Sequence, residues 1–282
     1  MINILFGGNY KVFDGILLCV MSITKNTKEA LNVFILTADV TELNPQYKPI
    51  KSEDVLFLNN YLKQKNKHSK ATLIKLGSEF NEWIHLSKNQ LNTYTPFAFL
   101  RLFSDTIKEL PKKIIYLDTD IMVPGNIKEL FNIDINDYEL AAVRDLNGQW
   151  FIGANYFNSG VLLMNLKKIK ETNLLQKVKQ MCLTKKMAFP DQSALNKLTT
   201  KIKYLPRKFN EQHKLKKDTI IQHFCKRIKW LPFFKTQNIK QWQIDDVQNV
   251  YKIHAYDDIY EEFAILKDMQ NIDNYKSVWY NF

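Results

Sequence analysis

Short apolar segments alternate with segments of helical periodicity along the first part of this chain, and this alternation restricts the fold more than any other feature. INILFG (2–7), LNVFILTA (31–38) and ATLIKLG (71–77) are rich in apolar residues, as buried strands are. Between the first two, apolar residues recur at helical spacing from Val12 to Ile23. Strands that alternate with helices in this way form a mostly parallel α/β sheet.

The pattern continues to about residue 205 and then weakens. We predict strands at 113–118, 138–145 and 156–166, and helices at 52–66, 92–107, 126–131, 167–183 and 190–198. Thr95 and Pro96 suit the N-cap and the first position of the helix at 92–107. We expect one α/β domain over residues 1–240, with a helical extension at 241–282 that packs on it.

The formal charge of +11 favours anionic partners. The sequence has no RNA-reading signature, zinc-finger spacing or basic region that leads into heptads, so nucleic acid is not the expected partner. KRIKWLPFFK (226–235) mixes basic and aromatic residues, which would suit peripheral contact with an anionic membrane surface. Three cysteines without paired spacing and an N-terminus without signal-peptide features predict a cytoplasmic protein, with the inner face of the membrane as an alternative location.

Two carboxylates follow an apolar strand in IIYLDTD (114–120). Asp118 and Asp120 would point to one face of a strand, where charges about 6 Å apart repel by roughly 0.7 kcal/mol in water and about 3 kcal/mol at an effective dielectric constant of 20. The carboxyl end of a parallel strand is also where open α/β sheets bind ligands. A divalent cation held there would bridge the phosphates of a nucleotide. The alternative is that either aspartate caps the turn or the short helix that follows.

Four ordered motifs, LPKKIIYLDTDIMVPGNIKELF, YFNSGVLLMNLKK, FPDQSALN and HFCKRIKW, resemble the retaining glycosyltransferases of family 8. These include bacterial lipopolysaccharide galactosyl- and glucosyltransferases and, more distantly, glycogenin. The resemblance extends from the first strand to about Trp230. It implies a GT-A fold and the transfer of a hexose, glucose or galactose, from a UDP-sugar to a glycan, lipid-linked or protein acceptor.

The resemblance also implies a metal site. In the family, the Asp-x-Asp motif binds Mn²⁺ together with the histidine of a His-x-x-Gly-x-x-Lys-Pro-Trp motif, which corresponds here to Asp118, Thr119, Asp120 and His223. An imidazole nitrogen beside two carboxylates favours Mn²⁺, with Mg²⁺ as the alternative. A lone histidine at this position could also be a hydrogen-bonded residue at a strand end.

The same motif implies basic contacts to the diphosphate. Lys229 matches the family's lysine, whereas Lys226 replaces its glycine and no proline precedes Trp230. Glycine lets the backbone approach a phosphate closely, and Lys226 would instead offer its ammonium group. The alternative for both lysines is a solvated basic surface.

The remaining residues implied by the resemblance surround the donor. Family members carry an acidic pair before Asn-Tyr, near the uracil ring, where this chain has two glycines. We expect Phe6, Gly7, Asn9 and Tyr10 to contact the nucleotide, with Tyr10 stacked on the base; the alternative is a plain Gly-Gly turn. Arg101 matches an Arg-Leu position close to the donor sugar and phosphates.

Sugar and acceptor contacts are implied for Asp145, Asn158, Ser159, Asp191 and Gln192. Asp191 also suits the N-cap of the helix at 190–198. Glutamine is a poor nucleophile, so we expect attack on the same face as the departing diphosphate, with Gln192 stabilising the cationic sugar.

Two competing functions remain open. Phosphohydrolases of the haloacid dehalogenase type also place Asp-x-Asp after an apolar strand, and Asp245-Asp246 offers a second acidic pair, although no apolar strand precedes it. A non-catalytic relative that binds a sugar nucleotide or an anionic surface would fit the changes at Gly7 and Lys226.

Overall fold

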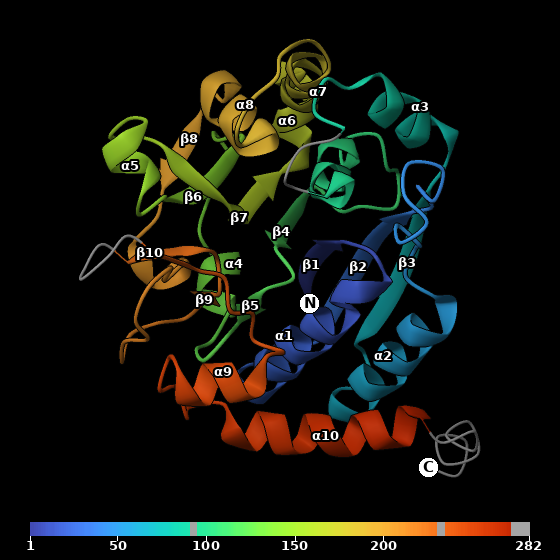
Figure 1. Cartoon of the computed structure of the whole chain (residues 1–282), viewed down its shortest axis with the longest axis vertical. Coiled ribbons are helices and arrows are strands. Elements are labelled where there is room, and N and C mark those ends of the chain that lie inside the picture. Colours follow the sequence, from blue (N-terminus) through green and yellow to red (C-terminus); the bar gives the residue numbers. More distant parts are fainter. Residues whose placement is uncertain (91–94, 230–234, 272–282) are drawn as a thin grey trace.

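The computed structural model describes residues 1–90, 95–229 and 235–271, and its centre is a sheet of seven strands between two layers of helices (Figure 1). The strand order is β3-β2-β1-β4-β7-β6-β8. These strands are β1 (Ile2–Gly7), β2 (Leu31–Ala38), β3 (Lys70–Leu76), β4 (Lys113–Leu117), β6 (Leu140–Arg144), β7 (Phe157–Asn165) and β8 (Ile202–Tyr204). β7 is antiparallel to both of its neighbours and the other pairs are parallel, which confirms the expected mostly parallel α/β sheet.

Alternate side chains of the central strands enter two separate cores. In β1, Ile4 and Phe6 join one core, and Leu5 joins the other. The first core is covered by α1 (Phe13–Asn26), α2 (Ser52–Lys65) and α10 (Asp257–Asn271). The second is covered by α3 (Ser78–Leu86), the 3-10 helix η2 (Pro96–Phe103), α6 (Leu166–Thr172), α7 (Leu174–Thr184) and α8 (Pro190–Leu198).

Short elements close one end of the sheet. β5 (Ile121–Met122) pairs antiparallel with β9 (Gln222–His223), and β10 (Arg227–Lys229) pairs with β11 (Lys235–Gln237). The remaining helices are η1 (Tyr10–Val12), α4 (Lys128–Phe131), α5 (Gly148–Phe151), η3 (Arg207–Phe209) and α9 (Ile244–Asn249). The β5–β9 pairing joins segments about a hundred residues apart in the sequence.

Two helix predictions need correction. The α-helix predicted at 92–107 is the 3-10 helix η2, with Pro96 at its start as expected; residues 91–94 lie outside the described part of the chain. All residues of η2 except Ala98 are buried. The helix therefore has no single apolar face, and its conformation is determined by packing around nearly its whole surface. The helix predicted at 167–183 is two helices, because Asn173 adopts a left-handed conformation with φ 53°.

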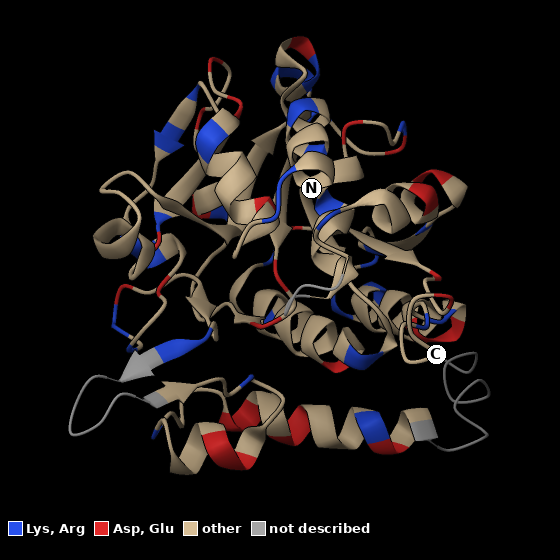
Figure 2. Ribbon diagram, turned by 45° about the horizontal axis from the view of Figure 1, so that its top comes forward, with Lys and Arg blue, Asp and Glu red and all other residues tan. Residues whose placement is uncertain are grey.

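The C-terminal helix α10 packs on α1 and α2. Tyr260, Phe263 and Leu266 enter the first core, and Lys267 Nζ donates to Asp14 Oδ1 of α1 at 2.9 Å. Figure 2 shows that acidic residues gather on α9 and α10, although the chain is strongly basic. The division into a domain and an extension at residue 240 stays a prediction, and residues 272–282 lie outside the described part. Among the described helices, none is long and apolar enough to cross a membrane.

Candidate functional site

Asp118 and Asp120 lie in the turn that joins β4 to β5. β4 ends at Leu117, and the Asp118 N–H donates to the carbonyl of Gly160 in β7 at 2.7 Å. The two carboxylates therefore converge because of the turn, and the expectation that they share one face of a strand was wrong. The capping alternative is also wrong, because α4 has no side-chain cap and both carboxylates contact other side chains.

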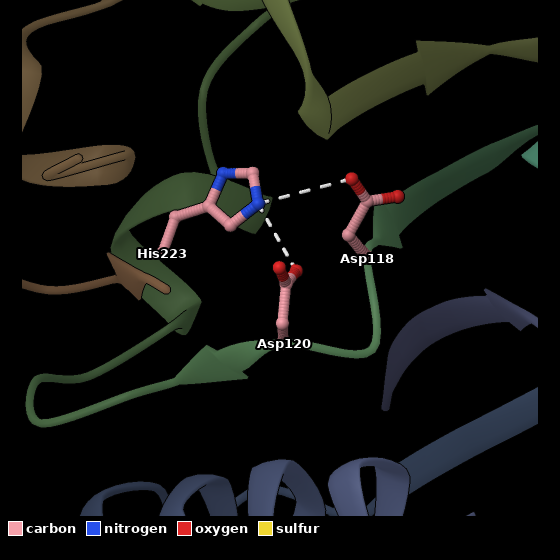
Figure 3. A group of neighbouring side chains, drawn as sticks. All are labelled: Asp118, Asp120 and His223. Atoms are coloured by element: carbon pink, nitrogen blue, oxygen red, sulfur yellow. Dashed lines mark ion pairs between the residues drawn. The ribbon is translucent and has the colours of Figure 1, made fainter. Parts of the chain in front are cut away.

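His223 reaches this turn through the β5–β9 pairing, in which it lies opposite Ile121. Its Nε2 atom is 3.0 Å from Asp120 Oδ1 and 3.8 Å from Asp118 Oδ2 (Figure 3). One donor atom from each of the three residues lies within 4.8 Å of the others. Adjacent ligands about 2.1 Å from an octahedral metal lie about 3 Å apart, so the three side chains fit one divalent cation.

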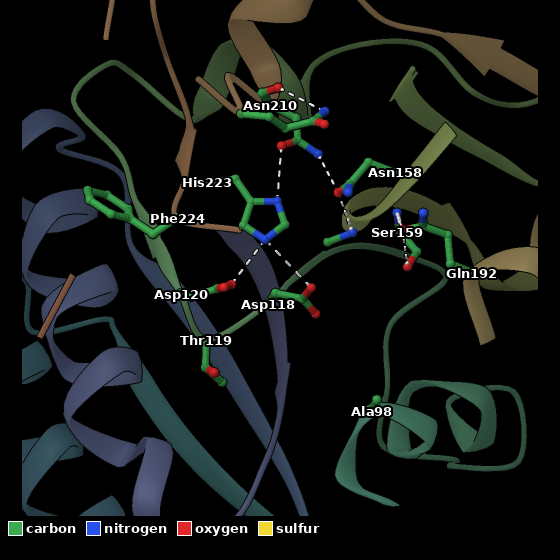
Figure 4. A network of polar contacts seen from close by, with 12 residues as sticks. Ala98, Asp118, Thr119, Asp120, Asn158, Ser159, Gln192, Asn210, His223 and Phe224 are labelled. Carbon is green, nitrogen blue, oxygen red and sulfur yellow. Dashed lines mark hydrogen bonds and ion pairs between the residues drawn. The ribbon is translucent and has the colours of Figure 1, made fainter. Parts of the chain in front are cut away.

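A chain of buried amides holds His223. Its Nδ1 atom lies 3.2 Å from Asn210 Oδ1, and Asn210 Nδ2 donates to Asn158 Oδ1 at 2.9 Å (Figure 4). Asn158 Nδ2 in turn donates to Asp145 Oδ2 at 2.9 Å. A neutral imidazole that donates from Nδ1 to Asn210 leaves the Nε2 lone pair directed at the aspartates, as metal binding requires. Asn210 was missed at the sequence level.

Arg101 provides a buried cation on one side of the site. Its Nη2 atom lies 3.0 Å from Asp118 Oδ1 and 3.4 Å from Asp191 Oδ2, and Nη1 donates to the Ser159 carbonyl at 2.6 Å. The hydroxyl of Tyr116 donates to Asp118 Oδ1 at 2.8 Å. Burial raises the pKa of Asp191, and the guanidinium of Arg101 opposes that rise.

Lys240 provides a second cation on the other side. Its Nζ atom lies 2.5 Å from Asp120 Oδ2 and donates to the Phe224 carbonyl at 3.1 Å. Burial alone would raise the pKa of Asp120, but His223 and Lys240 outweigh it and hold that pKa well below its usual range. Burial alone would lower the pKa of His223, but Asp120 outweighs it and raises that pKa.

Arg101 and Lys240 therefore neutralise the two carboxylates. From the sequence, we had expected a bound metal ion to do this. Next to Lys240, Gln241 is fully buried, and its Nε2 donates to the Thr119 carbonyl at 2.7 Å. Neither residue was predicted. The segment NIKQWQ has no recognisable pattern, and nothing in it indicates contact with a turn 120 residues earlier.

Gln192 of α8 lies among the predicted sugar-binding residues. Its Oε1 accepts from the Ser159 N–H at 3.0 Å and from Ser159 Oγ at 3.2 Å, and its Nε2 donates to Asp145 Oδ2 at 3.4 Å. Asp191 lies inside the first turn of α8, where Phe189 is the N-cap, so the capping role considered for Asp191 is wrong. Hydrogen bonds and ion pairs thus connect nine predicted residues with Tyr116, Asn210 and Lys240, which were not predicted. The nine are Arg101, Asp118, Asp120, Asp145, Asn158, Ser159, Asp191, Gln192 and His223.

The turn after β1 borders the site without bonding to its carboxylates. A Cβ atom at Gly8 would lie 3.7 Å from Thr119 Cγ2, so the two turns are neighbours. Phe6 is buried in β1, which ends at Gly7. Asn9 is the N-cap of η1, without a side-chain cap bond, and the Tyr10 hydroxyl donates to Gln46 Oε1 at 3.0 Å.

The basic residues of the predicted diphosphate site are only partly described. Lys226 is exposed between β9 and β10. Lys229 ends β10, and its side chain lies outside the described part, as do Trp230 and residues 231–234 of the segment considered for membrane contact.

Comparisons with known proteins identify one family, and the relatives found are glycosyltransferases. The family model described as "Glycosyl transferase family 8" matches residues 3–246. Glycosyltransferase GlyA of Streptococcus pneumoniae is 33% identical over 182 residues, which cover 62% of this chain but only 22% of that protein. Lipopolysaccharide 1,2-glucosyltransferase of Escherichia coli K12 is 24% identical over 245 residues, with 80% of this chain and 68% of that protein covered.

A solved structure shows the same fold. The galactosyltransferase LgtC in complex with donor and acceptor sugar analogs superimposes with a TM-score of 0.66 at 17% identity, over 94% of this chain and 95% of that chain. The predicted GT-A fold is therefore confirmed.

Proposed function

Because the chain belongs to glycosyl transferase family 8, we propose that it is a retaining glycosyltransferase that moves glucose or galactose from a UDP-sugar to a glycan, lipid-linked or protein acceptor. The observation that carries this proposal is the convergence of Asp118, Asp120 and His223 beside the buried Arg101 at the carboxyl end of β4. Open α/β sheets bind nucleotides at such strand ends. Asp245-Asp246 lies in the first turn of the helix α9 and does not follow a strand of the sheet, so the phosphohydrolase alternative has no support.

Asp118, Asp120 and His223 would hold Mn²⁺, with Mg²⁺ as the alternative. When bound, the metal would neutralise the negative charge of a nucleoside diphosphate as it leaves the sugar. Arg101 would orient the donor from the opposite side of Asp118, and Lys226 and Lys229 would supply further positive charge to the phosphates. Gly7, Asn9 and Tyr10 would contact the nucleoside, because their turn adjoins Thr119, whereas Phe6, whose side chain is buried in the first core, would contribute only its backbone.

The sugar would lie beside Gln192. Its Oε1 already accepts two hydrogen bonds from Ser159, which lowers its ability to attack C1 as a nucleophile. We therefore favour attack of the acceptor hydroxyl on the face that the diphosphate leaves, which retains the anomeric configuration. Asp145, Asn158, Asp191 and Gln192 would hold the sugar hydroxyls and stabilise the cationic ring.

The direct test is NMR-monitored turnover of UDP-glucose and UDP-galactose, with Mn²⁺, with Mg²⁺ and with EDTA. We expect Mn²⁺-dependent release of UDP that falls at least a hundredfold in Asp120→Asn. Asp137→Asn makes the same chemical change at an exposed residue and should retain full activity. Binding of a UDP-sugar without turnover of any nucleotide sugar would favour the non-catalytic relative. A covalent sugar adduct on a side chain would contradict same-face attack.

A further inference from the structure

Lys240 contacts the candidate metal site but does not lie between the three proposed ligands, Asp118, Asp120 and His223. Its ammonium contacts Asp120 Oδ2, whereas His223 contacts the other carboxylate oxygen, Oδ1. A metal bound through Asp118, Oδ1 of Asp120 and His223 would therefore share the Asp120 carboxylate with Lys240. Two cations on one buried carboxylate repel each other, and the repulsion is stronger than in water because little solvent screens it.

The ammonium group is fixed in place by its neighbours along the chain. Lys240 also donates to the Phe224 carbonyl at 3.1 Å, and the adjacent Gln241 is bound to the Thr119 carbonyl. Trp242 packs against Gly15 of α1, where an added Cβ atom would lie 2.6 Å from its ring. Lys240 thus belongs to a segment that packs against the turn holding Asp118 and Asp120, and its ammonium group lies within the site.

We propose that Lys240 couples metal binding to donor binding. In the donor-free protein, its charge offsets that of Asp120, as Arg101 offsets Asp118, and the attraction of the site for a divalent cation is weak. The diphosphate of the donor adds negative charge beside both the metal and Lys240, so the metal binds tightly only when the donor is present. The inference rests on the proposed UDP-sugar donor, and linkage requires that the metal tighten donor binding by the same factor.

The test measures Mn²⁺ affinity by electron paramagnetic resonance, with and without UDP. In the wild-type chain, UDP should tighten Mn²⁺ binding at least tenfold. In Lys240→Met, Mn²⁺ should bind at least tenfold more tightly than in the wild type without UDP, and the effect of UDP should shrink at least fivefold. Lys240→Arg keeps the charge and should resemble the wild type. Lys217→Met removes an exposed lysine and should also resemble it.

Lys240→Met could instead weaken Mn²⁺ binding, because loss of a hydrogen bond to a metal ligand commonly weakens metal binding 10- to 100-fold. Unchanged or weaker Mn²⁺ binding in Lys240→Met without UDP would overturn the coupling, as would Lys240→Arg behaving like Lys240→Met. If UDP strengthens Mn²⁺ binding equally in the wild type and in Lys240→Met, the coupling role fails and the proposed function stands. If the wild type binds no Mn²⁺ even with UDP, both fail.

Discussion

Gly160 is the residue whose small size the candidate site most depends on. A Cβ atom built at this position would lie 2.3 Å from His223 Cε1 and 2.8 Å from Asp118 Oδ2, closer than atoms approach without moving. Any larger residue must therefore displace two of the three proposed metal ligands.

Gly160→Ala should consequently weaken Mn²⁺ binding in the presence of UDP at least tenfold, because its methyl group would separate His223 from Asp118. Isothermal titration with Mn²⁺ measures this. Gly153→Ala is the matched control, since a Cβ atom there meets nothing within 4 Å. Equal Mn²⁺ affinity in the two variants would mean that the ligands do not need the observed arrangement.

The sequence predicted individual site residues where they lie in motifs with a fixed local context. Asp118 and Asp120 follow an apolar strand, and His223 opens a recognisable motif. Asn210 and Lys240 had no such signal, because each acquires its role only through contact with residues far away in the sequence. Arg101 was predicted as a contact to the donor, but the sequence did not indicate that it would pair with Asp118 or that Lys240 would pair with Asp120.

At the scale of elements, the six longest strands of the sheet were predicted to within about two residues, because both faces of the central strands are buried. The three-residue β8 and the short β5, β9, β10 and β11 were not predicted. Helices such as α1 and α8 were predicted from their apolar faces, but α3, which also buries one apolar face, was missed. η2 is buried on nearly all sides and therefore gave no indication of its 3-10 conformation. The short α5 after Asp145 was not predicted, since four residues are too few for periodicity to appear.

The break between α6 and α7 depends on the left-handed conformation of Asn173, which has φ 53° and ψ 32°. Glycine adopts this conformation without strain, whereas alanine is disfavoured in it by about 1–2 kcal/mol. Asn173→Ala should therefore lower the free energy of unfolding, measured in urea, by about 1 kcal/mol relative to Asn173→Gly. Mn²⁺ affinity should be the same in both variants. Equal stability of the two variants would show that residue 173 does not adopt the left-handed conformation that separates α6 from α7.

At the scale of the whole molecule, α10 is part of the first core. Its residues Tyr260, Phe263 and Leu266 share that core with α1 and α2, and ion pairs such as that between Lys267 and Asp14 join the helices at their surface. We expected residues 241–282 to pack on the domain, but the alternation of strands and helices gave no indication that α10 would share a core with α1 and α2.

Phe263→Ala should lower the stability of the entire chain by about 3–5 kcal/mol, because it leaves a cavity in the shared core. Calorimetry should show one unfolding transition, shifted to lower temperature. Ile265→Ala on the same helix is the control, since Ile265 is 58% exposed and its loss should cost less than about 1 kcal/mol. A new low-temperature transition in Phe263→Ala, with the main transition unchanged, would instead indicate that residues 241–282 unfold as a separate extension.

The central claim is that Asp118, Asp120 and His223 hold one divalent cation against the phosphates of a sugar nucleotide. Anomalous diffraction at the manganese absorption edge, from crystals grown with Mn²⁺ and UDP, tests it most directly. We predict one strong peak within about 2.3 Å of an oxygen of each aspartate and of His223 Nε2, with the UDP phosphates beside it. A manganese peak elsewhere, or bound UDP with no peak between these three side chains, would contradict the account.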